Sequence, residues 1–104
     1  MSYDIYIEDE FGVEVGSTNI TYNVSPMFKL AFDNEKGINI LQDLSTDDAL
    51  PLLIKAYRDM YHNPEKYDVL NPPNGWGSRE TTVKALHNII NHVIIGENCK
   101  IFIC

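Results

Sequence analysis

The sequence predicts one α+β domain, in which a small antiparallel sheet, made of an N-terminal hairpin and a C-terminal strand, packs against about three helices. Three observations predict this fold class. Apolar and polar residues alternate near the N-terminus, two later segments carry apolar residues at helical spacing, and a short β-prone run lies near the end. A length of 104 residues suits a single domain, and a hydrophobic fraction of 44% is typical of a globular protein.

A β-hairpin is predicted at the N-terminus. Apolar and polar side chains alternate over residues 3–8 and again over residues 11–15, which is the period of a half-buried strand. Asp9, Glu10 and Gly12 lie between the two runs and supply the turn. The acidic cluster at this tip lacks the ligand spacing of a calcium-binding loop, so we expect it to be solvated.

A short helix is predicted next. Residues 16–24 are polar and β-prone, and they fit either a third strand or an ordered loop. Ser25 and Pro26 then form a helix start, with Ser as the N-cap and Pro at the first helical position, where its missing N–H costs nothing. We expect this helix to cover residues 26–33.

A second helix is predicted to begin at residues 45–48, whose carboxylates suit the positive end of the helix dipole. It ends at Asn63 and Pro64, because proline disfavours helical geometry in the residue before it. Residues 65–77 are rich in Pro, Gly and Asn and predict a long loop. The apolar stripe of this helix is predicted to contain Leu50, Leu53, Ile54, Tyr57, Met60 and Tyr61.

The third helix and the last strand follow. Ser78 is the predicted N-cap of the helix, and Gly96 is placed to end it. Residues 100–103 are short, apolar and β-prone, and we expect them to form a strand that pairs with the hairpin. The apolar stripe of this helix is predicted to contain Val83, Leu86, Ile90 and Val93.

The chain is acidic overall. Eight Lys and Arg against fifteen Asp and Glu leave a formal net charge of -7, and the first fifteen residues contain five acids and no base. Such a field repels nucleic acid and anionic membranes, and it suits a basic protein partner. The first five residues lack the basic region of a signal peptide, and no apolar run reaches a membrane-spanning length, so we expect a cytoplasmic protein without a membrane or DNA partner.

The sequence contains no recognisable catalytic or metal motif. His87 and His92 are five residues apart, which separates them by about 140° around a helix axis. Cys99 and Cys104 lack metal-site or redox-motif spacing, and we expect both to be reduced thiols. We therefore predict no catalytic residue, no metal ion and no cofactor, although catalytic groups that assemble in space leave no such motif.

Two polar segments, residues 19–27 and 71–78, each lead into a predicted helix start. Free N–H groups and a positive dipole at such a start suit an anion, and the sole tryptophan lies between two glycines, where its ring can stack on a flat ligand. Arg79 in a first helical turn is unfavourable for the dipole, so its guanidinium is a candidate anion ligand. Turn formation, helix capping and a surface arginine are the purely structural alternatives. The predicted ligand-binding residues are Asn19, Thr21, Asn23, Ser25, Asn74, Trp76, Ser78 and Arg79.

At these two segments the chain resembles a family of small, mostly uncharacterised bacteriophage and prophage proteins. Members share an acidic β-rich start, an N-[IV]-[ST]-x-N-[VL]-[SG]-x-M stretch and an NP-x-NGWG motif before a last helix and strand. The matching residues are 19–27 and 71–77, residues 63–67 are also similar, and the order of elements agrees over nearly the whole chain. Pro73 occupies a position that is often acidic in the family. Small phage proteins of this kind are often counter-defence factors, and some families sequester nucleotide immune signals such as cyclic dinucleotides and ADP-ribose derivatives made by host TIR proteins.

Three functional hypotheses remain open at this point. The resemblance implies a non-enzymatic phage protein that sequesters an ADP-ribose-type or cyclic nucleotide signal in the host cytoplasm. The acidic surface fits an inhibitor that binds a basic host defence factor. A small phosphodiesterase-like enzyme is the third. We also expect a homo-oligomer, because residues 101–103 predict an apolar edge strand that a second copy would cover.

Overall fold

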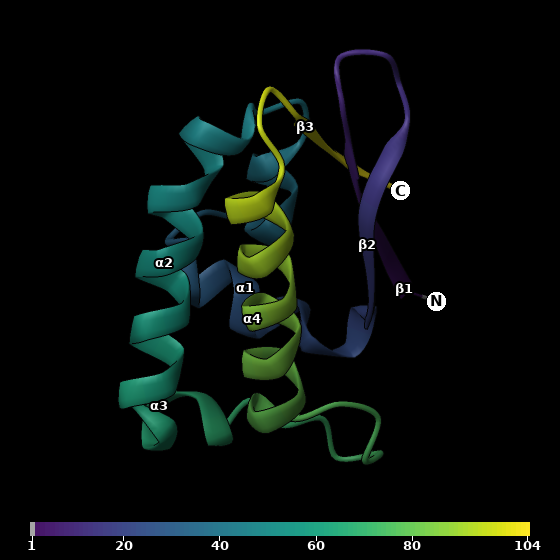
Figure 1. Cartoon of the computed structure of the whole chain (residues 1–104). Coiled ribbons are helices and arrows are strands. Elements are labelled where there is room, and N and C mark those ends of the chain that lie inside the picture. The colour runs from purple at the N-terminus through teal and green to yellow at the C-terminus, as the bar shows by residue number, and fades with distance from the viewer. Residues whose placement is uncertain (1) are drawn as a thin grey trace.

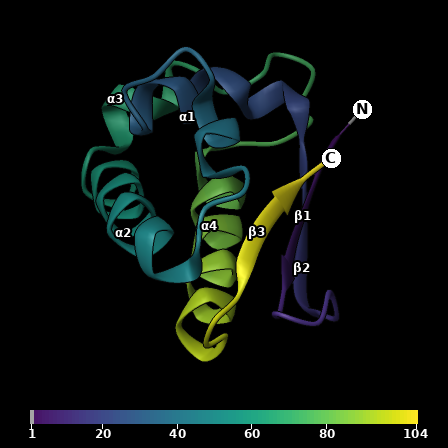
Figure 2. The same cartoon turned by 90° about the horizontal axis from the view of Figure 1, so that it is seen from above.

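The computed structural model describes residues 2–104 and contains a three-stranded antiparallel sheet with the helices packed on one of its faces (Figures 1 and 2). The order of the strands is β2-β1-β3, so β1 is central. The predicted fold class is confirmed, with four α-helices in place of about three. The strands are β1 (Ser2–Glu8), β2 (Glu14–Thr21) and β3 (Lys100–Ile103), and the helices are α1 (Ser25–Ala31), α2 (Thr46–His62), α3 (Pro64–Asp68) and α4 (Arg79–Ile95), with short 3₁₀ turns at η1 (Tyr22–Val24) and η2 (Gly37–Leu41).

The N-terminal hairpin forms, but its turn is longer than predicted. The carboxylate of Asp9 accepts hydrogen bonds from the backbone amides of Phe11 and Val13, which directs this stretch away from the strand ladder. The prediction of a half-buried strand is therefore wrong for residues 11–13. Glu14 and Val15 do belong to β2, but the apolar side chains of residues 11–15 are exposed. The second strand instead occupies Glu14–Thr21, most of which the sequence left open between strand and loop.

The core lies between the sheet and the two long helices. Ile5 and Ile7 of β1 and Ile101 of β3 point to this face and are at most 1% exposed. Gly16 of β2 lies against α4, where a Cβ atom would come within 2.6 Å of the His92 ring. Burial of these side chains is the main source of stability, since each large apolar side chain contributes about 1.5–3 kcal/mol.

The buried residues of α2 agree only in part with the predicted apolar stripe. Leu53 and Met60 are fully buried, whereas Tyr61 is 55% exposed. Ala49 and Ala56 complete the buried stripe, because their small side chains let α2 lie close to its neighbours. The remaining predicted members, Leu50, Ile54 and Tyr57, are partly buried against the core. In α4, the predicted Leu86, Ile90 and Val93 are buried and Val83 is partly buried.

Two of the three predicted helix caps are confirmed. The Ser45 side chain accepts from the Asp48 amide, and the Ser78 side chain accepts from the Thr81 amide. Ser25 does not cap α1 as predicted. It is already helical, and its hydroxyl donates to the carbonyl oxygen of Tyr22 and hydrogen-bonds the hydroxyl of Tyr3. The 3₁₀ turn before α1 continues directly into the helix, so no separate cap is formed.

The predicted loop over residues 65–77 contains a short helix. Pro64 begins α3, and the fully buried ring of Tyr67 anchors it to the core. The hydroxyl of Tyr67 donates to the carboxylate of Asp59 in α2. The irregular part of the connection is therefore limited to residues 69–78, before α4 begins.

The outer edge of β3 is covered by the chain itself. The amide of Asp43 donates to the carbonyl oxygen of Ile101 at 2.8 Å, and the amide of Ile101 donates to the carbonyl oxygen of Leu44 at 3.0 Å. The amide of Ile103 donates to Oε1 of Gln42 at 2.6 Å. The C-terminal strand pairs with β1 as predicted, but it does not present the free edge on which we based self-association.

Candidate functional site

The two polar segments singled out by the sequence lie against each other in the structure. The loop before α4 passes beside the end of β2 and the turn that follows it (Figures 1 and 2). Gly77 is the closest point, since a Cβ atom built there would stand 2.8 Å from Cγ2 of Thr21 and from Cγ1 of Val24. Its φ of +99° is also a conformation that side chains rarely adopt. Glycine at this position therefore allows the two segments to meet.

A hollow of about 250 Å³ lies at this junction. Trp76 forms one wall and is 69% exposed, so its ring is presented to solvent instead of filling the core. The opposite wall comes from the end of β2, and the floor comes from the first turns of α4. The lining residues are Asn19, Ile20, Thr21, Trp76, Gly77, Thr81 and Ala85.

Polar groups of the hollow are held in place by hydrogen bonds. Nδ2 of Asn19 donates to Oγ of Ser2 and to Oδ1 of Asp4. Oγ1 of Thr21 accepts from the backbone and side-chain nitrogens of Asn23. Within residues 2–104, no partner is bonded to Oδ1 of Asn19 or to the indole N–H of Trp76, and the Thr21 hydroxyl hydrogen is likewise uncommitted. Among the residues that line the hollow, Asn19, Thr21 and Trp76 thus retain one acceptor and two donors.

Four predicted ligand residues do not line the hollow. Asn23 folds back onto Thr21, and Ser25 is bonded within the turn before α1. Oδ1 of Asn74 accepts from the Trp76 amide at 2.9 Å, which fixes the loop that carries the indole. Ser78 caps α4 through a capping box with Thr81. These side chains act as turn and cap residues, which was the structural alternative for each.

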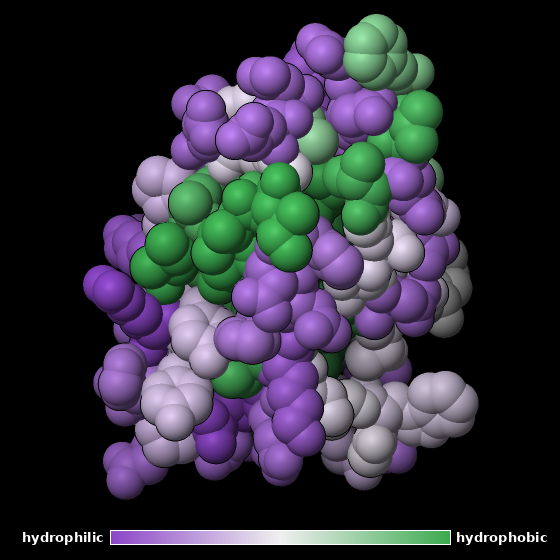
Figure 3. All heavy atoms as spheres, viewed as in Figure 1, coloured by the Kyte–Doolittle hydropathy of each residue, from purple (hydrophilic) through white to green (hydrophobic). Residues whose placement is uncertain are grey.

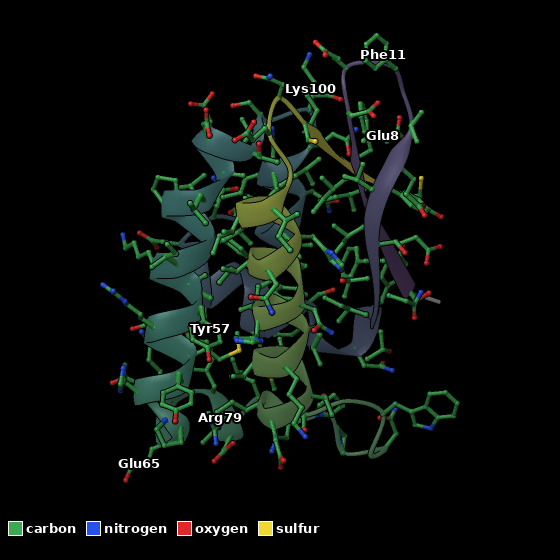
Figure 4. The ribbon with its side chains drawn as sticks, in the orientation of Figure 1. Glu8, Phe11, Tyr57, Glu65, Arg79 and Lys100 are labelled. Carbon is green, nitrogen blue, oxygen red and sulfur yellow. The ribbon has the colours of Figure 1, made fainter. Side chains whose placement is uncertain are left out.

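Arg79 points away from this hollow. Its Nε atom donates to Oδ1 of Asp68 at 3.0 Å, and Nη1 lies 3.5 Å from the carbonyl oxygen of Met60. It lines a separate hollow of about 570 Å³ between α2 and α4, near Tyr57 (Figure 4). Because its guanidinium is engaged there, the structure does not bring Arg79 and Trp76 to the same hollow, contrary to what the sequence predicts.

The helix starts are also less available to an anion than predicted. In α4, the amide of Arg79 donates to Oδ1 of Asn71, and the amide of Thr81 donates to Oγ of Ser78. The other start belongs to α1, which is only seven residues long. The hollow is therefore suited to a flat, uncharged ring with polar edges more than to a phosphate group.

Sequence reasoning missed three lining positions besides Gly77. Thr81 and Ala85 lie four residues apart on one face of α4, directly after the predicted cap. That spacing is a usable signal, because residues four apart lie on the same face of a helix. Ile20 left no signal, since it is a buried member of β2.

Four other hollows formed by residues 2–104 are larger, and these four are not lined by both motif segments. One of about 730 Å³ lies between α1 and α2 and carries Lys55, Arg58, His62 and Lys66. Lys66 is paired with Asp59 at 2.9 Å. Among the described residues, no three His, Cys, Asp or Glu side chains gather closely enough to hold a metal ion.

The comparisons with known proteins assign no family. No family model matches the sequence, and neither the curated proteins nor the solved structures include a significant match. None of the helices formed by residues 2–104 has the apolar length that crossing a bilayer demands.

Proposed function

We propose that this chain is a non-enzymatic binding protein that captures a nucleotide-derived molecule by its flat base in the hollow beside Trp76. The observation that carries the proposal is the convergence of the two motif segments, residues 19–23 and 71–78, on one hollow. These segments lie some fifty positions apart along the chain. They meet at Gly77, where the distance between them is too short for a side chain.

The chemistry of the hollow supports a planar heterocycle as the ligand. The exposed indole offers a stacking surface, and stacking of a base on an aromatic side chain contributes about 1–3 kcal/mol. Asn19 and Thr21 line the hollow, and their side chains retain an acceptor and a donor that suit the polar edge of a ring. A volume of about 250 Å³ is below that of a site for a whole dinucleotide, so sugar and phosphate groups extend into solvent.

The biological role follows from the family resemblance. We propose a counter-defence protein of a bacteriophage, which sequesters a nucleotide immune signal of the ADP-ribose or cyclic nucleotide type in the host cytoplasm. Sequestration requires binding without turnover, and the described part of the chain brings no recognisable catalytic constellation to this hollow.

Intrinsic fluorescence provides a direct test, because Trp76 is the sole tryptophan of the chain. Titration with adenosine monophosphate, ADP-ribose and a cyclic dinucleotide is expected to quench or shift its emission with at least one of them. Calorimetry with that ligand is expected to show no binding by Trp76→Ala and about tenfold weaker binding by Thr21→Val, which loses one hydrogen bond. Phe11→Ala is the matched control, since Phe11 is also an exposed aromatic residue and does not line the hollow.

Two outcomes decide against the proposal. If no compound of the panel changes the tryptophan emission, the proposal that the ligand is nucleotide-derived is contradicted. A change in the mass of the bound nucleotide on incubation would replace sequestration with the phosphodiesterase-like alternative.

A further inference from the structure

The tip of the hairpin and the end of α4 expose several large apolar side chains, which we call the hairpin–helix patch. Phe11 is 82% exposed, Val13 56% and Val15 48%, while Ile94 is 61% and Ile95 79% exposed. The space-filling view shows apolar side chains gathered across the upper part of this face (Figure 3). Contiguous apolar surface is uncommon on a folded monomer and usually marks a binding site.

The two parts of the patch are joined by a shared hollow. Val15 and Ile95 both line a depression of about 330 Å³, together with Asp9, His92 and Glu97. Phe11 stands at the extreme tip of the hairpin, beyond this depression (Figure 4). The patch thus consists of a concave centre with an aromatic side chain at one end.

The rim of the patch is strongly acidic. Residues 8–15 contain four carboxylates and residues 92–97 contain one, and neither range contains Lys or Arg. The hydroxyl of Thr46 donates to the carbonyl oxygen of Gly96 at 3.0 Å, which places the acidic first turn of α2 beside the end of α4. Lys100 lies beside this rim, where it is the register partner of Glu8 (Figure 4).

The helix dipole adds to this negative field. The C-terminal end of α4 lies within the patch, and its last turn contains His92 but no Lys or Arg. The uncompensated carbonyl groups at such an end favour a cation, and the last turn of α4 contains neither Lys nor Arg. A cationic group from outside would complete the end of the helix.

Charge distinguishes between the possible occupants of the patch. In a symmetric dimer the same surface meets itself, so the acidic rim of one copy would face the acidic rim of the other. Like charges brought together in this way oppose association, whereas a basic partner is attracted. Arg79 and Lys84, the two Lys or Arg residues of α4, lie in the N-terminal half of that helix, away from the patch at its C-terminal end (Figure 4).

We propose that the hairpin–helix patch docks a cationic amphipathic segment of another protein. The apolar face of that segment covers Val15 and Ile95, and its Lys or Arg side chains pair with the acidic rim and with the end of α4. This surface is separate from the Trp76 hollow, so the two proposals stand or fall independently.

The test uses a synthetic amphipathic peptide of Leu and Lys, about four helical turns long, and a scrambled peptide of the same composition. Fluorescence anisotropy is expected to show binding of the amphipathic peptide that weakens as salt rises. Ile95→Ser and Phe11→Ser are expected to weaken it about tenfold or more, since each removes apolar contact area. Val69→Ser is the control, because Val69 is 80% exposed outside the patch. Trp76→Ala is expected to have no effect.

Three results would overturn the proposal. Equal binding of the scrambled peptide would mean that charge alone is recognised. Unchanged binding by Ile95→Ser and Phe11→Ser would place the contact elsewhere. A dimer in light scattering that Ile95→Ser dissociates would show that a second copy occupies the patch.

Discussion

Gly77 and Thr21 are in such close contact that the backbone of one segment rests on the side chain of the other. A Cβ atom at position 77 would lie 2.8 Å from Cγ2 of Thr21, a separation that real Cβ atoms do not show. The contact joins the loop that carries Trp76 to the end of β2, which supplies the polar groups of the hollow. The geometry of the candidate site therefore depends on residue 77 having no Cβ atom.

Gly77→Ala is expected to disrupt this contact. The substitution forces an L side chain into a φ of +99° and against Thr21, and we expect a loss of stability of about 1–3 kcal/mol together with loss of ligand binding. Gly75→Ala is the matched control, because Gly75 has a φ of +77° but nothing within 4 Å of the new Cβ. Urea unfolding and calorimetry of both variants measure the two effects.

The comparison separates backbone strain from steric contact. Gly75→Ala is expected to lose some stability and to keep binding, since its strain lies at the tip of the loop. Equal losses of binding by both variants would mean that loop flexibility, and not the approach to Thr21, matters for the site.

The fold was largely predictable because its local signals agree with its tertiary contacts. The caps at Ser45 and Ser78 and the alternation in β1 reflect backbone chemistry that operates within a few residues. The turn at residues 9–13 was not predictable from alternation alone. One carboxylate, that of Asp9, bonds two amides there and removes an apparently strand-like run from the ladder.

The candidate site was predictable only in its location. Composition identified the segments around Thr21 and Trp76, and the structure brings both to one hollow. The direction of a side chain depends on its tertiary partners, which a sequence does not show. Arg79 illustrates this limit, because Asp68 of α3 draws it to the other side of the helix start.

Arg79→Gln is expected to leave ligand binding unchanged. The guanidinium is bonded to Asp68 and to the carbonyl of Met60, so its loss is expected to lower stability by about 1 kcal/mol or less. Lys84→Gln is the control for removing one positive charge from α4, since Lys84 is highly exposed and has only a loose pairing with Glu80. If ligand affinity falls about tenfold in Arg79→Gln but not in Lys84→Gln, Arg79 contributes to ligand binding and this expectation is wrong.

Ser78→Ala is expected to lower stability by about 1 kcal/mol, because the Thr81 amide loses its capping acceptor. Ser78→Gly is expected to cost only a few tenths of a kcal/mol, since glycine is itself tolerated at this position. Chemical unfolding of the two variants distinguishes capping from a general effect of shortening the side chain. Equal losses for Ala and Gly would contradict the capping role.

Tyr67 and Asp59 form the most perturbed titrating pair among the described residues. The Tyr67 hydroxyl and the Lys66 ammonium both donate to Asp59, and these hydrogen bonds lower the pKa of the carboxyl group. Burial of the Tyr67 ring, followed by the hydrogen bond to Asp59, raises the pKa of its hydroxyl. Across the neutral pH range Asp59 is therefore ionised and the Tyr67 hydroxyl is protonated. The hydrogen bond between them connects α3 to α2.

Asp59→Asn is therefore expected to destabilise the protein in a pH-dependent way. Because the pKa of Asp59 is lower in the folded than in the unfolded state, its stabilising effect is complete above the unfolded value near 4 and is lost as the pH falls through the folded value. We expect the substitution to lower the free energy of unfolding by about 1–2 kcal/mol at pH 7 and by less in strong acid. Urea unfolding at neutral and at strongly acidic pH measures this difference. Glu35→Gln is the control, since within residues 2–104 the Glu35 carboxylate has neither a hydrogen bond nor an ion pair. A loss that stays constant from neutral to acid pH would show that Asp59 acts through packing and not through its charge.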